Sequence, residues 1–315
     1  MRVMLLAEPG RFREAQRPEP DVGPGELLLG TEACGLCASE LDVFLGRNPW
    51  QQYPASLGHE VVGRVLAVGP GVAGWQEGEL VAAALAGSGY AEAVAIDATA
   101  ALPVPDGLAP PLALAEPLAC AVNSVGAIAP APNDRIVVLG AGFLGLLLVQ
   151  LLRGVAPQWL LVAARRPEAC ALAAELGAAE TCEPLQVQQR VSAYTGGKGA
   201  DVVIEATGSE EMLAIAASML RPEGTLAIVG YHQGEGRRVP VHEWNWKALR
   251  IANCHFRSRD RMIDGGRRGL ALAARGVLEV ERLITHRFSL SDLQHGFETA
   301  ASRPPGFVKA VILPG

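Results

Sequence analysis

The sequence contains no block of like charges and no long apolar run. Its net charge is −6, with 27 Lys and Arg and 33 Asp and Glu spread over 315 residues. Without a basic cluster, the electrostatic footprint of nucleic-acid binding is missing. The longest apolar candidate, VLGAGFLGLLLVQLL, ends at Arg153, short of the roughly 18 residues of a membrane span. We therefore expect a protein that binds neither nucleic acid nor membrane.

Signals for secretion and for low-complexity structure are also scarce. The apolar run after Arg2 has about four residues, whereas a signal peptide needs roughly 7–15, so MRVMLLA is predicted to be a first β-strand. The 36 glycines and 22 prolines are dispersed, which predicts no long linker or tail. We expect a cytoplasmic protein whose six cysteines are reduced.

Hydrophobic patterning divides the chain into two domains, as its length also favours. Residues 1–105 read as short strands between turns that contain Gly and Pro. Beyond an apolar helical stretch at 111–128, apolar runs such as DRIVVLG, WLLVAA and DVVIEATG alternate with helices, which is typical of a parallel sheet covered on both faces. We predict an α/β protein with a β-rich domain at 1–124 and 270–315 and a doubly wound domain at 125–269.

A glycine-rich turn in the second domain predicts a dinucleotide site. GAGFLG (140–145) follows a predicted strand and opens a helix, the context in which G-x-G-x-x-G is informative. Gly140 permits the tight turn, Gly142 the approach of the pyrophosphate, and Gly145 the packing of helix against strand. The helix N-terminus faces the phosphates. The predicted contacts here are Gly140, Gly142, Phe143, Leu144 and Gly145.

The end of the next strand predicts which nicotinamide dinucleotide binds. An NAD site carries an acidic residue about 20 residues beyond the glycines, for the ribose 2′-hydroxyl. Ala164 stands there instead, followed by Arg165 and Arg166, whose guanidinium groups match a 2′-phosphate. We predict NADP in preference to NAD. Further cofactor contacts are expected at two later strand ends, at Thr207, Gly208, Gly230 and Tyr231.

The stretch ACGLCASEL raises the question of what Cys34 and Cys37 do. A zinc knuckle needs a second such pair or two histidines, and the other four cysteines stand alone. A redox dithiol is expected at the start of a helix that follows a strand, whereas this region reads as β-rich. His59 in SLGHEVVGRV and Glu116 in LALAEPLACAV are candidate partners, because thiolate, imidazole and carboxylate together suit zinc.

These motifs together resemble the zinc-dependent medium-chain dehydrogenase/reductases, the superfamily of alcohol and polyol dehydrogenases. The resemblance runs in order through GPGELLL, ACGLCASEL, LGHEVVGRV, GELV, GYAEAVAI, AEPLACAV, VVLGAGFLG, VIEATG and FVKAVIL, over essentially the whole chain. It implies that the β-rich domain is GroES-like and that the other is a Rossmann domain. It also implies a small-molecule substrate and a homodimer or homotetramer.

Specific roles follow from the resemblance. It implies that Cys37 and His59 bind a catalytic zinc and that Cys34 is a buried small residue. As in sorbitol dehydrogenase and its relatives, a glutamate replaces the family's third cysteine. Glu116 and Glu60 both qualify as the third ligand, and the resemblance does not decide between them. Ser39 matches the hydroxyl that takes the proton of the alcohol, so the predicted catalytic residues are Cys37, Ser39, His59 and Glu60.

Three departures from the family pattern stand out. Only AAALAGS separates GELV from GYAE, so the family's four-cysteine lobe and its structural zinc are missing. Glu40 replaces the usual aspartate, and Asp42 stands where the proton-relay histidine is expected. The prediction is one zinc and hydride transfer between NADP(H) and a secondary alcohol or polyol and its carbonyl. Two alternatives are a zinc-free quinone or enoyl reductase and a non-catalytic scaffold that keeps the cofactor.

Overall fold

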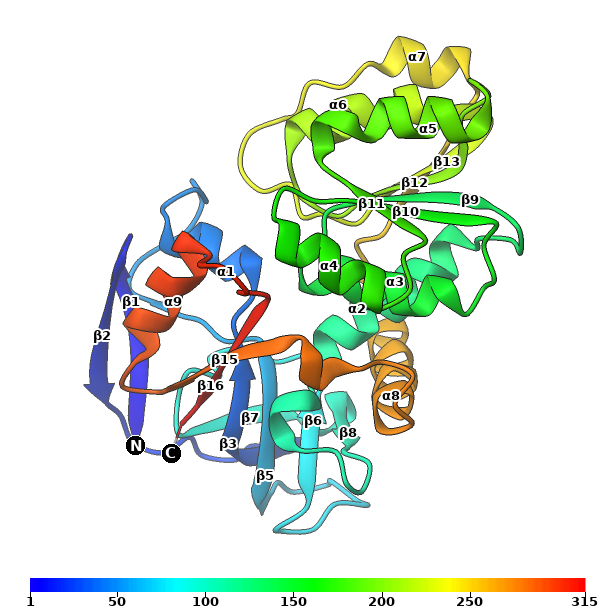
Figure 1. Ribbon diagram of the computed structural model, residues 1–315. Coiled ribbons are helices and arrows are strands. Elements are labelled where there is room, and N and C mark those ends of the chain that lie inside the picture. The colour runs from blue at the N-terminus through cyan, green and yellow to red at the C-terminus, as the bar shows by residue number, and fades with distance from the viewer. Residues whose placement is uncertain (315) are drawn as a thin grey trace. The chain divides into compact units, whose positions relative to one another are not determined.

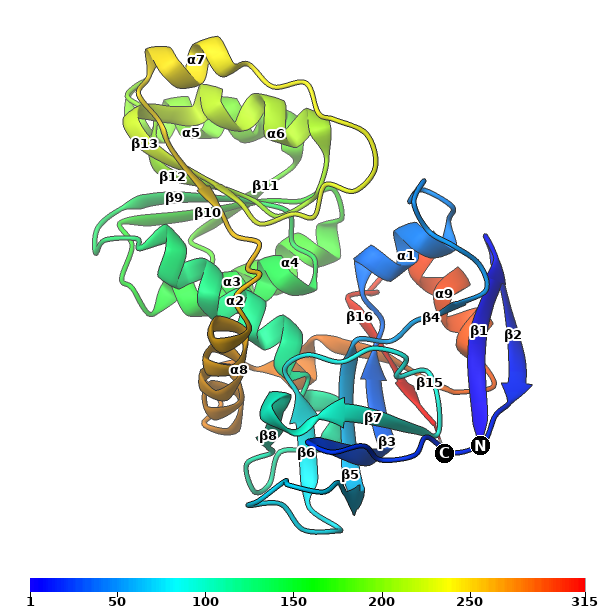
Figure 2. The ribbon, with the colours of Figure 1, turned by 180° about the vertical axis from the view of Figure 1, so that it is seen from behind.

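The computed structural model describes residues 1–314, which form two compact units (Figures 1 and 2). The first comprises residues 1–119 and 257–314, and the second is Cys120–Phe256. These boundaries differ from the predicted 124/125 and 269/270. The reason at the second boundary is helix α8 (Arg259–Ala274), which packs on strand β8 (Ala101–Pro103) in the first unit. Its Gly266 and Gly269 lie against Leu102 and Leu118, where a Cβ would meet side-chain atoms at 2.8 and 2.6 Å.

The first unit is built mainly on antiparallel sheet, with β15 and β16 paired in parallel. Its strands are β1 (Arg2–Glu8), β2 (Arg11–Gln16), β3 (Glu26–Gly35), β4 (Ala55–Ser56), β5 (Glu60–Val68), β6 (Leu80–Ala83), β7 (Ala93–Asp97), β8, β15 (Ile284–Ser289) and β16 (Lys309–Leu313). Strands β2-β1-β4 form a small sheet. The large sheet has the order β15-β16-β3-β5-β6-β8, with β7 paired to β3. The C-terminal strands thus join the sheet formed by the N-terminal part of the chain.

An aromatic cluster fills the core beside helices α1 (Ala38–Phe44) and α9 (Leu293–Ser302). The rings of Phe12 and Phe297 lie 4.8 Å apart, and Phe44 packs against both. Tyr90 meets Phe297 edge to face. Such ring pairs add about 0.5–1.5 kcal/mol each to the burial of their apolar area. Phe44 is therefore a packing residue, whereas Trp50 in the following loop is 75% exposed.

The second unit is a six-stranded parallel sheet in the order β11-β10-β9-β12-β13-β14. Its elements are β9 (Arg135–Leu139), α3 (Phe143–Arg153), β10 (Trp159–Ala163), α4 (Pro167–Glu175), β11 (Glu180–Cys182), α5 (Val187–Thr195), β12 (Ala200–Glu205), α6 (Glu210–Ala216), β13 (Leu220–Ile228), α7 (Val241–Trp246) and β14 (Arg250–Asn253). Counted from β9, this is the 3-2-1-4-5-6 order of a doubly wound sheet. Helices α3 and α4 cover one face and α5 and α6 the other (Figures 1 and 2). The predicted fold class is confirmed.

The expectation that the chain has no apolar run as long as a membrane span is wrong at helix α2 (Ala115–Ile128). Together with a preceding 3₁₀ turn (Pro110–Leu112), it forms the stretch Pro110–Ile128, which is long and apolar enough to cross a membrane by length and composition. In an 18-residue window of that stretch 61% is buried inside the fold, as in the core helix of a folded domain. Glu116 is the only charged residue in the stretch Pro110–Ile128, so the stretch remains apolar on average.

Candidate functional site

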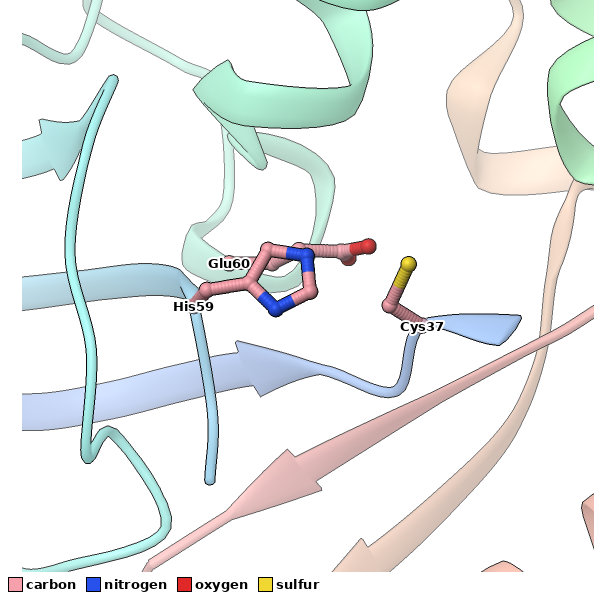
Figure 3. Close-up of side chains that lie close together, drawn as sticks. All are labelled: Cys37, His59 and Glu60. Atoms are coloured by element: carbon pink, nitrogen blue, oxygen red, sulfur yellow. The ribbon is translucent and has the colours of Figure 1, made fainter. Parts of the chain in front are cut away.

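Strand pairing brings together the residues that the sequence singled out in the first unit. Gly35, at the end of β3, pairs with Glu60, the first residue of β5. Cys37 follows β3 and caps the start of α1, and His59 immediately precedes β5. The donor atoms of Cys37, His59 and Glu60 lie within 4.8 Å of one another, and Figure 3 shows their side chains directed into one space.

Glycines make room for this cluster. A Cβ on Gly35 would lie 1.8 Å from Oε2 of Glu60, so a side chain there would displace the carboxylate. Gly58 has φ +103°, and its Cβ would lie 2.6 Å from the backbone nitrogen of Tyr90. The glycine before His59 therefore serves a left-handed conformation and a close approach of two backbones.

The location of Cys37 differs from the β-rich setting expected from the sequence, because α1 begins directly after it. A cysteine after a strand and at a helix start is also the setting of a redox dithiol. However, Cys34 lies within β3 and has no exposed surface. Burial, together with the charges of Glu40 and Glu60, raises the pKa of the Cys34 thiol well above its ordinary value. The prediction that Cys34 is a buried apolar residue is confirmed.

Glu40 orients the imidazole of His59. Its Oε1 lies 2.8 Å from Nδ1 of His59 and accepts a hydrogen bond from the Gly58 N–H at 2.7 Å. Its Oε2 accepts a hydrogen bond from the Tyr90 hydroxyl at 2.6 Å. Holding Nδ1 in this way leaves Nε2 to face the cluster, the arrangement usual for a histidine that binds a metal. The sequence marked Glu40 only as a departure from the family pattern, and Tyr90 was missed.

Glu40 and His59 each shift the pKa of the other. Burial disfavours the charge on His59, but the charge of Glu40 and the hydrogen bonds to Cys37 and Glu40 outweigh it and raise the pKa of His59 far above its ordinary value. Burial likewise opposes the charge on Glu40, yet its interactions with His59 lower the pKa of that carboxyl. A proton and a metal ion compete for Nε2 of His59, so metal binding here would release a proton.

Glu60 is fully buried and paired with Lys309 of β16. The Lys309 ammonium donates a hydrogen bond to Oε1 at 2.7 Å and lies 2.6 Å from Oε2. Burial disfavours the charged Lys309, but Glu60 outweighs it and raises the pKa of the lysine. Oε2 of Glu60 is buried and is the acceptor of no hydrogen bond among the described residues. The sequence held no signal for Lys309, because 249 residues separate the two partners.

Glu116, in the first turn of α2, lies at the edge of the cluster. Its Oε2 is 4.0 Å from Nε2 of His59, and its side chain is 21% exposed. The structure thus brings all four predicted metal ligands to one place, three of them as a close set. A thiol, an imidazole and carboxylates gathered in this way fit the ligand preferences of zinc.

The remaining predicted catalytic residue is also at the cluster. The Ser39 hydroxyl donates a hydrogen bond to Sγ of Cys37 at 3.3 Å. Asp42, one turn later in α1, points elsewhere and forms an ion pair with Arg47 at 3.2 Å. Arg47 is well exposed, so this pair lies at the protein surface.

In the second unit, the three glycines of GAGFLG occupy the predicted positions after β9. Gly140 has φ +109°, and a Cβ there would lie 2.8 Å from the Thr207 side chain. A Cβ on Gly145 would lie 2.1 Å from the Gly140 carbonyl oxygen, so helix and turn touch at this point. A Cβ on Gly142, by contrast, would meet no described atom within 4 Å apart from its chain neighbours. Gly142 caps α3 without a side-chain hydrogen bond, which leaves this helix N-terminus open to a ligand.

A cavity of about 360 Å³ lies beyond the ends of β10 and β11. It is lined by Ala164, Arg165, Pro167, Cys170, Ala171, Thr181, Cys182, Glu183 and Gln186. Arg165 is an exposed side chain on its wall, whereas Arg166 is outside the lining and caps α4. The structure therefore separates the two arginines that the sequence treated alike.

The loops after β12 and β13 touch each other. A Cβ on Gly208 would lie 2.7 Å from the Tyr231 carbonyl oxygen, and one on Gly230 would lie 2.2 Å from the Gly208 nitrogen. Thr207 closes the other side, against Gly140. The predicted cofactor residues after β9, β12 and β13 thus gather at one edge of the sheet, where a doubly wound fold binds its ligand.

Comparison with known proteins agrees with this architecture. Residues 23–106 match the alcohol dehydrogenase GroES-like domain, and residues 144–265 match the zinc-binding dehydrogenase domain. L-galactonate-5-dehydrogenase of Escherichia coli (strain K12) is 25% identical, over 99% of this chain and 98% of its own length. The starvation-sensing protein RspB of the same strain is 28% identical, over 94% and 93%.

A solved structure, a putative zinc-binding dehydrogenase from Sinorhizobium meliloti 1021 bound to NADP, is 27% identical. It superposes with a TM-score of 0.86 over 99% of each chain. The relatives and the two domain matches support an oxidoreductase that uses a nicotinamide cofactor and acts on small molecules. With both domains matched in the family order, the chain belongs to the zinc-type medium-chain dehydrogenase/reductase superfamily.

Proposed function

We propose that this protein is a zinc-dependent dehydrogenase that transfers hydride between NADP(H) and a secondary alcohol or polyol, or the matching ketone or aldehyde. The observation that carries the proposal is the convergence of Cys37, His59 and Glu60, with Glu116 and Ser39 beside them. A relative that is by name a dehydrogenase of L-galactonate supports a polyhydroxylated substrate.

Cys37, His59 and Glu116 are the zinc ligands that we propose. The reason for preferring Glu116 is charge balance: Glu60 is already paired with the buried Lys309. Drawing Glu60 toward a metal would weaken its ion pair with that ammonium. Glu60 then borders the metal and holds Lys309, while the thiolate of Cys37 and the carboxylate of Glu116 balance the two charges of zinc.

Measuring zinc content separates the two carboxylates. Glu116→Gln should lose most of its zinc, and Glu60→Gln should keep more of it, when both are dialysed against the same weak chelator. The opposite order would show that Glu60 is the third ligand. Cys37→Ser is the reference variant for an emptied site.

Zinc held in this way would act as a Lewis acid that lowers the pKa of an alcohol. The chain's own contribution to proton transfer is Ser39, whose hydroxyl already lies against Cys37. We propose that Oγ of Ser39 takes the proton of the substrate hydroxyl and passes it outward. Asp42 is engaged with Arg47 at the surface, so we assign it no part in the relay. The proton would leave through water or the cofactor ribose.

The preference for NADP rests on the cavity beyond β10. Ala164 leaves no carboxylate at the position that would repel a 2′-phosphate, and Arg165 lines the wall. Glu183 lines the same cavity. Gly140, Gly142 and Gly145, with the N-terminus of α3, would receive the pyrophosphate.

The proposal extends to the cytoplasm as location, because all six cysteines are free thiols, and to a homodimer or homotetramer. One experiment tests its core: metal analysis of the purified protein, followed by turnover of NADP(H) with a panel of alcohols, polyols and carbonyls. About one zinc per chain with turnover supports it. Turnover of quinones or enones without zinc would indicate a reductase, and cofactor binding without any turnover would indicate a scaffold.

A further inference from the structure

A buried carboxylate lies beneath the loops that follow β12 and β13. Glu205 ends β12 and has no exposed surface. Its Oε1 accepts hydrogen bonds from the Thr207 backbone at 2.5 Å, from the Thr207 hydroxyl, and from the Gly208 N–H at 3.0 Å. Its backbone carbonyl accepts from the N–H groups of Val229 and Gly230, both at 2.8 Å. One residue thus holds both loops.

The other carboxylate oxygen of Glu205 engages a histidine from the second loop. Nε2 of His232 lies 2.8 Å from Oε2, and the His232 side chain is only 12% exposed. Nδ1 of the same ring is buried and has no hydrogen-bond partner among the described residues. The bond to Glu205 is therefore the polar contact that fixes the ring, and with it the chain just after Tyr231. A hydrogen bond to a carboxylate that is shielded from water is stronger than a hydrogen bond between neutral groups at the surface.

The two loops are packed closely against each other. Gly208 and Gly230 approach so closely that neither tolerates a Cβ. A shift of the second loop would consequently be transmitted to Gly208 and, through Thr207, to Gly140 at the switch point of the sheet. A small displacement of Glu205 or His232 would therefore change the backbone position of both loops at this edge of the sheet.

We propose that Glu205 and His232 are a positioning pair that sets the loops 206–208 and 229–232 for the nicotinamide end of the cofactor. The cavity beside Arg165 lies beyond β10 and β11, and the glycine turn follows β9 at the centre of the sheet. A dinucleotide that starts in that cavity and crosses the glycine turn ends over β12 and β13. The pair therefore acts on the half of the cofactor that is remote from the adenosine. This inference rests on the proposed use of NADP(H).

Two probes separate the halves of the cofactor: NADPH, and adenosine 2′,5′-bisphosphate, which lacks the nicotinamide half. Calorimetric titration of His232→Phe should show NADPH bound about tenfold more weakly, the effect of losing one charge-assisted bond, while the bisphosphate binds within about twofold of the unaltered protein. His232→Gln, whose amide can donate near the position of Nε2, should restore most of the NADPH affinity. His242→Phe, the same change at an exposed histidine of α7, is the matched control and should change neither.

Unchanged NADPH affinity in His232→Phe would overturn the inference. So would an equal loss for both probes, since that is what a purely structural role predicts. Should His232→Phe fail to fold, His232→Asn, whose shorter side chain cannot reach Oε2, is titrated in the same way with the same expectation. If the unaltered protein bound neither probe, the proposed cofactor itself would be wrong, and this inference would fall with it.

Discussion

Replacing Arg165 with alanine should selectively weaken the binding of NADPH. Arg165 lines the cavity beyond β10, whereas Arg166 caps α4 outside it. A charge-assisted hydrogen bond contributes about 1.5–3 kcal/mol, but Arg165 is exposed, so we expect the lower end of that range. About 1.5 kcal/mol corresponds to roughly a tenfold loss of NADPH affinity. The affinity for NADH, which has no 2′-phosphate, should remain the same.

The assay is a fluorescence titration of each variant with NADPH and with NADH at fixed ionic strength, because exposed charges are screened by salt. Arg166→Ala should change the ratio of the two affinities by less than Arg165→Ala does. Arg13→Ala removes another exposed arginine, from β2 in the other unit, and serves as the control.

Three results would contradict the reasoning. Equal losses of NADPH and NADH in Arg165→Ala would mean that the arginine supports the cavity and does not recognise the phosphate. A larger effect of Arg166→Ala would mean that the helix cap reorients toward the ligand and that the wall of the cavity is the wrong guide. Tighter binding of NADH than of NADPH by the unaltered protein would contradict the cofactor preference itself.

Further expectations concern the metal, the proton and stability. Cys37→Ser should hold little zinc by elemental analysis, against about one per chain in the unaltered protein; full occupancy would exclude Cys37 as a ligand. Ser39→Ala should keep zinc and cofactor but lower kcat by about 10²-fold, whereas Asp42→Ala should leave the pH–rate profile largely unchanged. A near-normal rate in the first, or a lost inflection in the second, would reassign the proton route. Asp201→Asn should lower the free energy of unfolding at pH 7 by about 1.5–3 kcal/mol, because the Asp201 carboxylate accepts bonds from Arg135 at 2.7 Å and from Arg221 at 2.6 Å. Although burial opposes the charge, these arginines lower the pKa of Asp201, so its contribution is present above the carboxyl's ordinary pKa and is lost as pH falls below about 4. A stability difference that does not shrink in acid, measured by urea unfolding, would contradict this.

The sequence alone determined the parts of this protein that depend on local pattern. Apolar runs alternating with helices predicted the doubly wound sheet, and a glycine turn between strand and helix predicted the ligand-binding edge. Gly140 and Gly145 could be assigned because backbone conformation and close packing leave no alternative to glycine there. Cys37 and His59 could be named because a thiol and an imidazole are zinc donors and because ACGLCASEL and LGHEVVGRV resemble the family's motifs.

Tertiary structure decided what surrounds those residues. Glu40 looked like a departure from a pattern, yet its longer side chain reaches both His59 and Tyr90. Helix α1 was not predicted, because its seven residues are too few to show a period. Lys309 of β16 neutralises Glu60 of β5, and His232 meets Glu205 from a neighbouring loop. Such contacts join side chains that are far apart along the chain, and no local periodicity records them. Which charges are matched, and so which carboxylate is available to a metal, follows only once the strands have been brought together.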